Sequence, residues 1–177
     1  MSNHKIVYRY MDSPLGTLII GTTSKGCCLL EFSDRHSLTD INSRYNKWYK
    51  MNCVEGTQST LDKLEDELKD YFERNLHSFS VPLDLRGTTF EISVWKELQK
   101  IPYGETRSYI DIARVIGNPS ASRAVGRANG NNPVAIVVPC HRVIASNGTL
   151  HGYGGGLWRK EKLLALESRK KSLTEFM

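Results

Sequence analysis

Polar and apolar residues alternate at the start of the chain, and a helical period replaces this pattern further along. Residues 5–10 alternate, and two apolar runs at 17–21 and 27–32 follow turns that contain glycine. Short runs separated by such turns predict an antiparallel three-stranded sheet. Apolar residues then recur every three or four positions between 61 and 72. We expect a helix there, with Ser59 available as its N-cap.

Two domains are expected from this change of pattern. Residues 33–56 are polar and lack a clear period, and residues 81–87 resemble a connector. We therefore predict an α+β protein with a small N-terminal α/β domain at residues 1–85. A helical domain would follow at residues 86–177.

The second half contains two pairs with the spacing of a capping box, Thr88 with Glu91 and Ser108 with Asp111. Each pair predicts the start of a helix. A tight turn follows the second helix, and residues 121–129 form another short helix. The outline is that of a helix-turn-helix, although most short helix pairs only pack a core.

The last third combines a β-branched run with a basic terminal helix. Residues 134–138 predict a buried strand that ends just before Cys140, and residues 147–148 are typical of a hairpin turn. Residues 158–171 predict a helix whose leucine face also carries Glu167. A carboxylate on a buried face needs a partner.

Charge is distributed unevenly along the chain. The net charge is +5, yet residues 1–85 hold ten basic and twelve acidic side chains, whereas residues 86–177 hold fourteen and seven. This asymmetry favours a polyanion partner for the second half, although a solvated basic face explains it almost equally well. The chain has no apolar run of ~18 residues and no signal peptide at its start, so we expect an intracellular protein.

Cys140 is the strongest candidate for chemistry. Most cysteines are small buried hydrophobes, and we interpret Cys27, Cys28 and Cys53 in this way. Cys140 instead precedes His141 in a basic segment, which favours the thiolate. A Cys-His pair oriented by Glu167 could act as a nucleophile and its base, and this set would fit a thiol hydrolase equally well.

A metal site is not predicted. Cys27 and Cys28 are adjacent rather than separated by two to four residues, and no pair of histidines has ligand spacing. The glycines between residues 152 and 156 do not match a phosphate-binding loop. We expect neither a metal nor another cofactor.

The segment around Cys140 and several others resemble those of a known family. Residues 136–144 (IVVPCHRVI) are similar to the active-site signature of the O6-alkylguanine-DNA alkyltransferases. Further segments match in family order and spacing, and together they cover nearly the whole chain: Ser13-Pro14-Leu15-Gly16, Ile101 to Glu105, Ser108-Tyr109, Arg123 to Gly126, Asn132-Pro133, Gly152-Tyr153 and Leu163 to Glu167.

The resemblance implies a single-turnover transfer of an alkyl group in duplex DNA to Cys140, from O6-alkylguanine and, as a second candidate substrate, O4-alkylthymine. His141 would activate Cys140 through water, and Glu167 would orient His141. Tyr109 would donate a proton or hydrogen bond to the guanine and crowd the phosphate during base flipping. The product is a thioether, which cellular reductants do not cleave, so each molecule acts once.

Further roles follow from the same resemblance. Arg123 would enter the duplex and fill the gap left by the flipped nucleotide, while Asn132 would brace the turn between the recognition helix and the cysteine. The remaining DNA contacts would come from Ser108, Ala124 and Arg127, and the base pocket would be formed by Val143, Tyr153 and Gly154.

The chain also departs from the family pattern. Position 154 is often serine in relatives, so Gly154 would act through its backbone amide alone. Asn129 and Gly130 replace bulkier residues of some relatives, which changes the expected groove contacts. Some members carry a structural zinc, but His4 and the paired cysteines do not reproduce those ligands.

Two alternatives come from other classes of protein. A thiol hydrolase would turn over repeatedly and need an oxyanion hole, and a pure DNA-binding module would function without Cys140. Alkyltransferase-like proteins that lack activity also lack the acceptor cysteine. We expect a monomer that binds alkylated double-stranded DNA, has no membrane contact and is cytoplasmic, or nuclear in a eukaryote.

Overall fold

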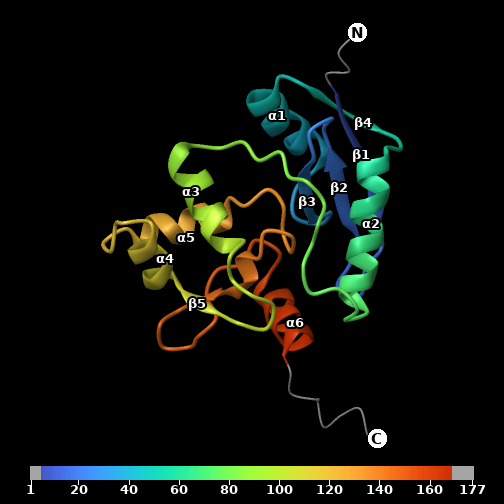
Figure 1. Ribbon diagram of the computed structural model, residues 1–177. Coiled ribbons are helices and arrows are strands. Elements are labelled where there is room, and N and C mark those ends of the chain that lie inside the picture. Colours follow the sequence, from blue (N-terminus) through green and yellow to red (C-terminus); the bar gives the residue numbers. More distant parts are fainter. Residues whose placement is uncertain (1–4, 169–177) are drawn as a thin grey trace, which may run out of the picture.

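The computed structural model describes residues 5–168 and shows a sheet with two helices beside a mainly helical region (Figure 1). The elements are β1 (Lys5–Met11), β2 (Leu18–Thr22), β3 (Cys27–Phe32), α1 (Leu38–Tyr49), β4 (Asn52–Glu55), α2 (Ser59–Phe72), α3 (Thr89–Leu98), β5 (Arg107–Ser108), α4 (Tyr109–Val115), α5 (Ser122–Gly130), a 3-10 turn (Cys140–Arg142), β6 (Val143–Ile144) and α6 (Leu157–Glu167). The α+β class is confirmed.

The N-terminal sheet has four strands in the order β3-β2-β1-β4, so the prediction of three strands was wrong. The three predicted strands do pair antiparallel, but β4 joins the edge parallel to β1. The connection to β4 contains α1, which begins with a capping box between Ser37 and Asp40. Both elements lie in residues 33–56, where α1 buries only Ile41, Tyr45 and Tyr49 and β4 is largely exposed, so few apolar positions mark either element.

The sheet is covered on both faces. Ile6 and Tyr8 of β1 pack on one side in a cluster with Ile41 and Tyr45 of α1. On the other side Val7 of β1 shares a larger core with α2 and with the helical region. Each fully buried aliphatic side chain of this kind contributes about 1.5–3 kcal/mol.

The larger core joins the sheet to the segment that carries Cys140. Leu30 of β3 donates its backbone N–H to the Pro133 carbonyl at 2.9 Å and accepts from the Ala135 N–H at 2.9 Å. Leu30 and Val134 are themselves fully buried. The N-terminal sheet therefore supports the chain just before the cysteine.

Both predicted capping boxes are present. Thr88 caps α3 with Glu91, and Ser108 caps α4 with Asp111. The prediction for Ser59 was wrong, because Ser59 is the first residue of α2 and Gln58 occupies the N-cap without a side-chain bond. A capping side chain must precede the first helical residue, and the apolar period does not fix that boundary to a single position.

The predicted strand at residues 134–138 is a tight turn, so this prediction was also wrong. Its backbone groups bond locally: Val138 donates to Val134 at 3.0 Å and Val137 donates to Ala135 at 2.8 Å. Ile136 has a φ of 71°, which a β-branched residue rarely adopts. The β-branched run indicates burial correctly, but these local bonds replace a strand ladder.

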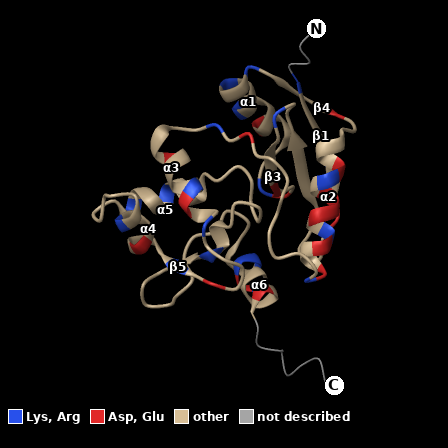
Figure 2. Cartoon of the chain, viewed as in Figure 1, with Lys and Arg blue, Asp and Glu red and all other residues tan. Residues whose placement is uncertain are grey.

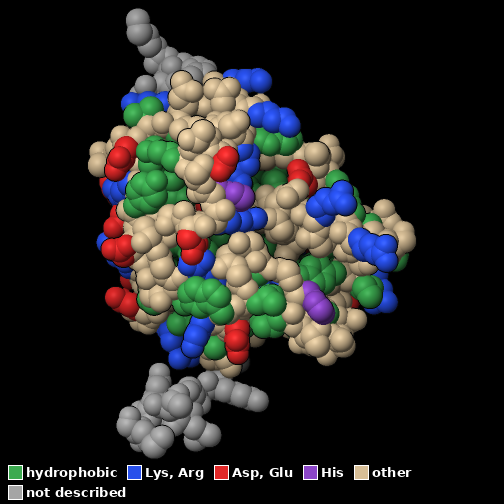
Figure 3. Space-filling model, turned by 180° about the vertical axis from the view of Figure 1, so that it is seen from behind, with side chains coloured by type: hydrophobic (Ala, Val, Ile, Leu, Met, Phe, Trp, Pro, Cys, Tyr) green, Lys and Arg blue, Asp and Glu red, His purple; other side chains and the backbone are tan. Residues whose placement is uncertain are grey.

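The charged residues of α4 and α5 are mostly arginines, whereas α2 carries many acidic residues (Figure 2). In the space-filling view, acidic side chains gather mainly along the left edge and basic ones lie on the right-hand lobe (Figure 3). The terminal helix, expected at residues 158–171, is α6, and positions after 168 lie outside the described residues, as does His4. Across residues 5–168 no helix is long and apolar enough to cross a bilayer.

Candidate active site

Cys140 begins the 3-10 turn and is 6% exposed. The Asn132 side chain lowers the pKa of the thiol and donates to the Val138 carbonyl at 2.8 Å. Its Oδ1 accepts from the Val134 N–H at 3.0 Å, and Asn129 donates to the Cys140 carbonyl at 3.2 Å. Two buried asparagines at the end of α5 thus fix the position of the cysteine.

The electrostatics at Cys140 differ from the expectation that a basic segment favours the thiolate. Burial raises the pKa of the Cys140 thiol and outweighs the opposing effects of Asn132, Lys160 and Arg35. The positive neighbours are therefore real, but they do not produce a resting thiolate. A base must take the thiol proton when the reaction occurs.

His141 and Glu167, which the sequence paired, are in direct contact. His141 Nε2 lies 2.7 Å from Glu167 Oε1, and both side chains are fully buried. Burial lowers the pKa of His141, against the opposing effect of Glu167, so the ring is neutral near pH 7. Because the carboxylate accepts and cannot donate, Nε2 carries the ring proton. His141 Nδ1 is then a free acceptor, and it has no hydrogen-bond partner among residues 5–168.

Glu167 is the centre of a larger buried network. Arg142 donates to it twice at 2.9 Å, through Nε and Nη2, and Tyr71 of α2 donates its hydroxyl at 2.6 Å. Burial alone would raise the pKa of Glu167, but hydrogen bonds from His141 and Arg142 hold it far below the usual range. The carboxylate therefore stays ionised and fixes the orientation of His141.

Tyr109 lies at the start of α4, where Ser108 serves as the N-cap. Its hydroxyl donates to the His151 carbonyl at 3.1 Å and accepts from Lys160 Nζ at 3.4 Å. Lys160 is fully buried, and burial lowers its pKa. Burial also raises the pKa of Tyr109, so the phenol keeps its proton and can donate it.

The helix α5 presents Arg123, Ala124 and Arg127 to solvent, while Val125 and Ala128 face the core. An open groove of about 440 Å³ runs beside this helix, with Arg123 and Tyr109 in its wall. Three of the predicted DNA contacts thus share one exposed face. Ser108 lies on a different element, at the N-cap of α4, where its hydroxyl accepts from the Asp111 N–H at 3.1 Å.

The predicted base pocket is closed in this structure. A cavity of only about 10 Å³ separates Cys140 from Tyr153, Gly154 and their neighbours. The Tyr153 hydroxyl is buried, without a partner within the described part of the chain, and burial raises its pKa strongly. Val143 is buried too, where β6 pairs with β5.

Most of the predicted residues are brought together, and sequence reasoning missed several others. The residues not predicted are Arg35, Tyr71, Arg142 and Lys160. Arg142 directly follows the Cys-His pair, so its position was a usable signal. Tyr71 is one of the apolar residues that recur at helical spacing between 61 and 72, which indicates burial but no role in the site. Nothing in the neighbouring sequence distinguishes Arg35 or Lys160 from surface cations. Between residues 5 and 168 no group of three His, Cys, Asp or Glu side chains could hold a metal ion.

Two family models match the chain. One, described as the ribonuclease-like domain of 6-O-methylguanine DNA methyltransferase, covers residues 6–85, and the other, the DNA-binding domain, covers residues 89–169. A methylated-DNA–protein-cysteine methyltransferase from Mycolicibacterium paratuberculosis is 49% identical over 97% of this chain and 99% of that relative. One from Mycobacterium bovis is 46% identical over 93% of this chain and 94% of its own.

Solved structures give the same result. The crystal structure of Mycobacterium tuberculosis OGT in complex with DNA is similar with a TM-score of 0.78 and 46% identity, over 91% of this chain and 92% of the other. The family models together span most of the sequence, and the relatives match nearly end to end. The chain belongs to the 6-O-methylguanine DNA methyltransferase family.

Proposed function

We propose that this protein repairs DNA by taking the alkyl group of O6-alkylguanine onto Cys140, once per molecule. The observation that carries the proposal is the buried Cys140 beside the His141–Glu167 pair. Asn129 of α5 donates to the Cys140 carbonyl, so the cysteine lies next to the helix whose other face is exposed. The names of the relatives support methyl transfer from DNA to a cysteine.

The first step activates the thiol. His141 Nδ1 accepts the proton of Cys140, directly or through one water, while Nε2–H stays bonded to Glu167. The ionised carboxylate stabilises the imidazolium that forms. Because burial raises the pKa of Cys140, the thiolate is produced at the moment of attack and is then poorly solvated and reactive.

The second step transfers the alkyl group. A bond forms between Cys140 Sγ and the alkyl carbon, and the bond from that carbon to O6 breaks. Its electron pair passes to the guanine, which takes a proton from the Tyr109 hydroxyl and leaves as a neutral base. Lys160 Nζ, 3.4 Å from that hydroxyl, stabilises the phenolate. The thioether is not hydrolysed, so the protein is consumed.

DNA binding places the base. Arg123 and Arg127 on the exposed face of α5 contact the duplex, and Arg123 fills the space of the flipped nucleotide. The basic C-terminal half supplies phosphate affinity that is independent of sequence. Flipping costs a few kcal/mol, and a weakened alkylguanine pair reduces this cost.

The flipped base enters between the α5 face and the glycine segment at residues 152–156. The Val143 carbonyl and the Gly154 amide read its edge, with Tyr153 along one side. Asn132 keeps the turn before Cys140 in place through its bonds to Val138 and Val134. The protein acts as a monomer in the compartment that holds the DNA, which is the cytoplasm, or the nucleus in a eukaryote.

Intact-protein mass after mixing with excess duplex DNA containing O6-methylguanine tests the proposal. We expect a gain of one methyl group on Cys140 and no second turnover, and no gain for Cys140→Ala. Unchanged mass with retained DNA binding would indicate a binding module. Repeated turnover would indicate a hydrolase.

A further inference from the structure

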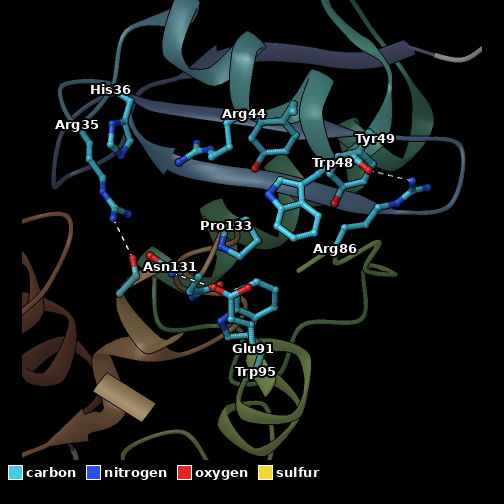
Figure 4. A pocket seen from close by; sticks show the side chains of 13 residues that line it. Arg35, His36, Arg44, Trp48, Tyr49, Arg86, Glu91, Trp95, Asn131 and Pro133 are labelled. Atoms are coloured by element: carbon cyan, nitrogen blue, oxygen red, sulfur yellow. Dashed lines mark hydrogen bonds between the residues drawn. The ribbon is translucent and has the colours of Figure 1, made fainter. Parts of the chain in front are cut away.

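One arginine of the N-terminal part reaches the Cys140 pocket. Arg35 lies in the connection from β3 to α1, and its Nη2 donates to the Gly130 carbonyl at the end of α5, at 2.9 Å (Figure 4). Its guanidinium lies directly against Gly154: a Cβ built on Gly154 would stand 2.3–2.5 Å from Cζ and both Nη atoms. Arg35 thus fills the space that a side chain at position 154 would occupy.

The consequence is a nearly filled pocket. The cavity bounded by Arg35, Cys140, Tyr153 and Gly154 measures about 10 Å³. A cavity needs roughly 10–15 Å³ of this kind to hold one water molecule. An alkyl group on the path to Cys140 therefore cannot enter while all four groups stay in place.

The backbone around this pocket is held firmly. Arg159 makes two 2.9 Å bonds to the Asp34 carboxylate and donates to the Gly155 carbonyl at 2.9 Å. It also donates to the Leu15 carbonyl and lies over the Phe32 ring. One buried guanidinium thereby fixes the distance between the Asp34 loop and the glycine segment. When the pocket opens, the side chain of Arg35 is the part that can move.

Space for that movement exists next to Arg35. A cavity of about 380 Å³ lies between α1 and the ends of α3 and α5, and Arg35 forms part of its wall (Figure 4). The Glu91 carboxylate lies in the same wall, bonded to Asn131 at 2.8 Å. Arg35 therefore lies between the nearly filled pocket at Cys140 and the larger interdomain cavity, whose wall holds Glu91 as well as Arg44 and Arg86.

We propose that Arg35 limits the size of the alkyl group that Cys140 accepts. A methyl group requires only a small displacement of the guanidinium along Gly154. A bulky group such as benzyl requires Arg35 to leave the Gly130 carbonyl and turn into the interdomain cavity. This inference rests on the proposed alkyl transfer and names a specificity residue for it in the N-terminal part.

The test compares free O6-benzylguanine with free O6-methylguanine, which removes DNA affinity from the measurement. Alkylation rate constants are followed by intact-protein mass for the wild type, Arg35→Ala and His36→Ala. Both substrates use the same thiol, so the benzyl-to-methyl ratio cancels differences in folded fraction and in thiol pKa. His36 lines the interdomain cavity but not the Cys140 pocket, and it is the matched control.

We expect the ratio to rise at least tenfold in Arg35→Ala and to stay within twofold of wild type in His36→Ala. A ratio in Arg35→Ala within twofold of wild type would overturn the inference. If Arg35→Ala does not fold, Arg35→Gln replaces it, since the shorter glutamine amide can still donate to the Gly130 carbonyl. The benzyl-to-methyl ratio of this variant is then compared with wild type by the same criterion. Absence of any methylation of the wild type by methylated DNA would instead refute the proposed function.

Discussion

Glutamine in place of Glu167 removes one buried charge while keeping the shape of the side chain. Oε1 accepts from Tyr71, His141 and Arg142, and Oε2 accepts from Arg142 and more weakly from the Gly104 N–H at 3.4 Å. An amide offers one acceptor oxygen, and its NH₂ group faces donors on the other side. The substitution therefore leaves the Arg142 guanidinium buried without a counter-ion.

The expected loss of stability is large. The Arg142 side chain is 7% exposed and Glu167 is fully buried, and breaking a buried pair costs about 3–5 kcal/mol. Domains are stable by about 5–15 kcal/mol in total. For a chain of this size a loss of 1 kcal/mol lowers Tm by about 2–4 °C, so Glu167→Gln should lower it by roughly 6–20 °C.

Alkyl transfer should also slow in the variant that remains folded. His141 can still donate Nε2–H to the amide oxygen, but a neutral amide does not stabilise the imidazolium. Positioned general bases contribute about 10²–10⁴-fold, and we expect a loss at the lower end of this range. Urea unfolding gives the stability, and single-turnover alkylation of methylated duplex DNA at 10 °C gives the rate.

Glu67→Gln is the matched control. Glu67 is also a buried carboxylate, and it accepts from the Ser80 and Val81 N–H groups, away from Cys140. Its replacement should lower stability while the folded protein alkylates at the wild-type rate. The reasoning fails if Glu167→Gln loses less than about 1 kcal/mol, or if it alkylates as fast as this control.

Two further predictions concern DNA and pH. Arg123→Ala should slow repair of duplex DNA at least tenfold and leave the reaction with free O6-methylguanine within twofold, because Arg123 is exposed on α5; equal losses would remove its role in flipping. The free energy of unfolding should be level near pH 7 and decrease as pH falls, first because the pKa of His141 is lowered from 6.5 and then because that of Glu167 is lowered from 4.5. In both cases the unfolded chain binds more protons. Glu167→Gln should weaken the second phase without abolishing it, because the pKa values of Asp34, Asp40, Glu91 and Asp111 are lowered as well. A stability independent of pH between 7 and 4 would contradict the assignment.

Local signals in the sequence predicted much of this fold. The capping boxes at Ser108 and Thr88 depend on residues three positions apart, and both are present. The alternating strands are also local, and their antiparallel pairing follows from short turns. The β-branched run at 134–138 misled because burial and strand formation produce the same apolar pattern. Here the Asn132 side chain closes a turn, which no period reveals.

The site was predicted where its residues are close in sequence or lie on an amphipathic helix. Glu167 was identified because a carboxylate on a leucine face must have a partner. Tyr71 could not be identified in this way, since it lies 96 residues from Glu167 in the sequence. Its place among the buried residues of α2 is fully explained by packing. Lys160 is one of the cations of the basic second half and nothing in the sequence sets it apart, yet it is completely buried. Charge alone does not show which cations the fold encloses.

The turn at residues 13–16 shows how a motif acquires its meaning only in three dimensions. In the sequence it is a loop between two strands, far from Cys140. In the structure the Leu15 carbonyl accepts from Arg159 Nε at 2.9 Å, and Gly16, with a φ of 114°, leaves room for Arg159 Nη2, which would stand 2.9 Å from a Cβ at that position. A side chain there would displace the guanidinium that holds the glycine segment. The N-terminal part therefore shapes the pocket through Arg159, and only glycine at position 16 permits this contact.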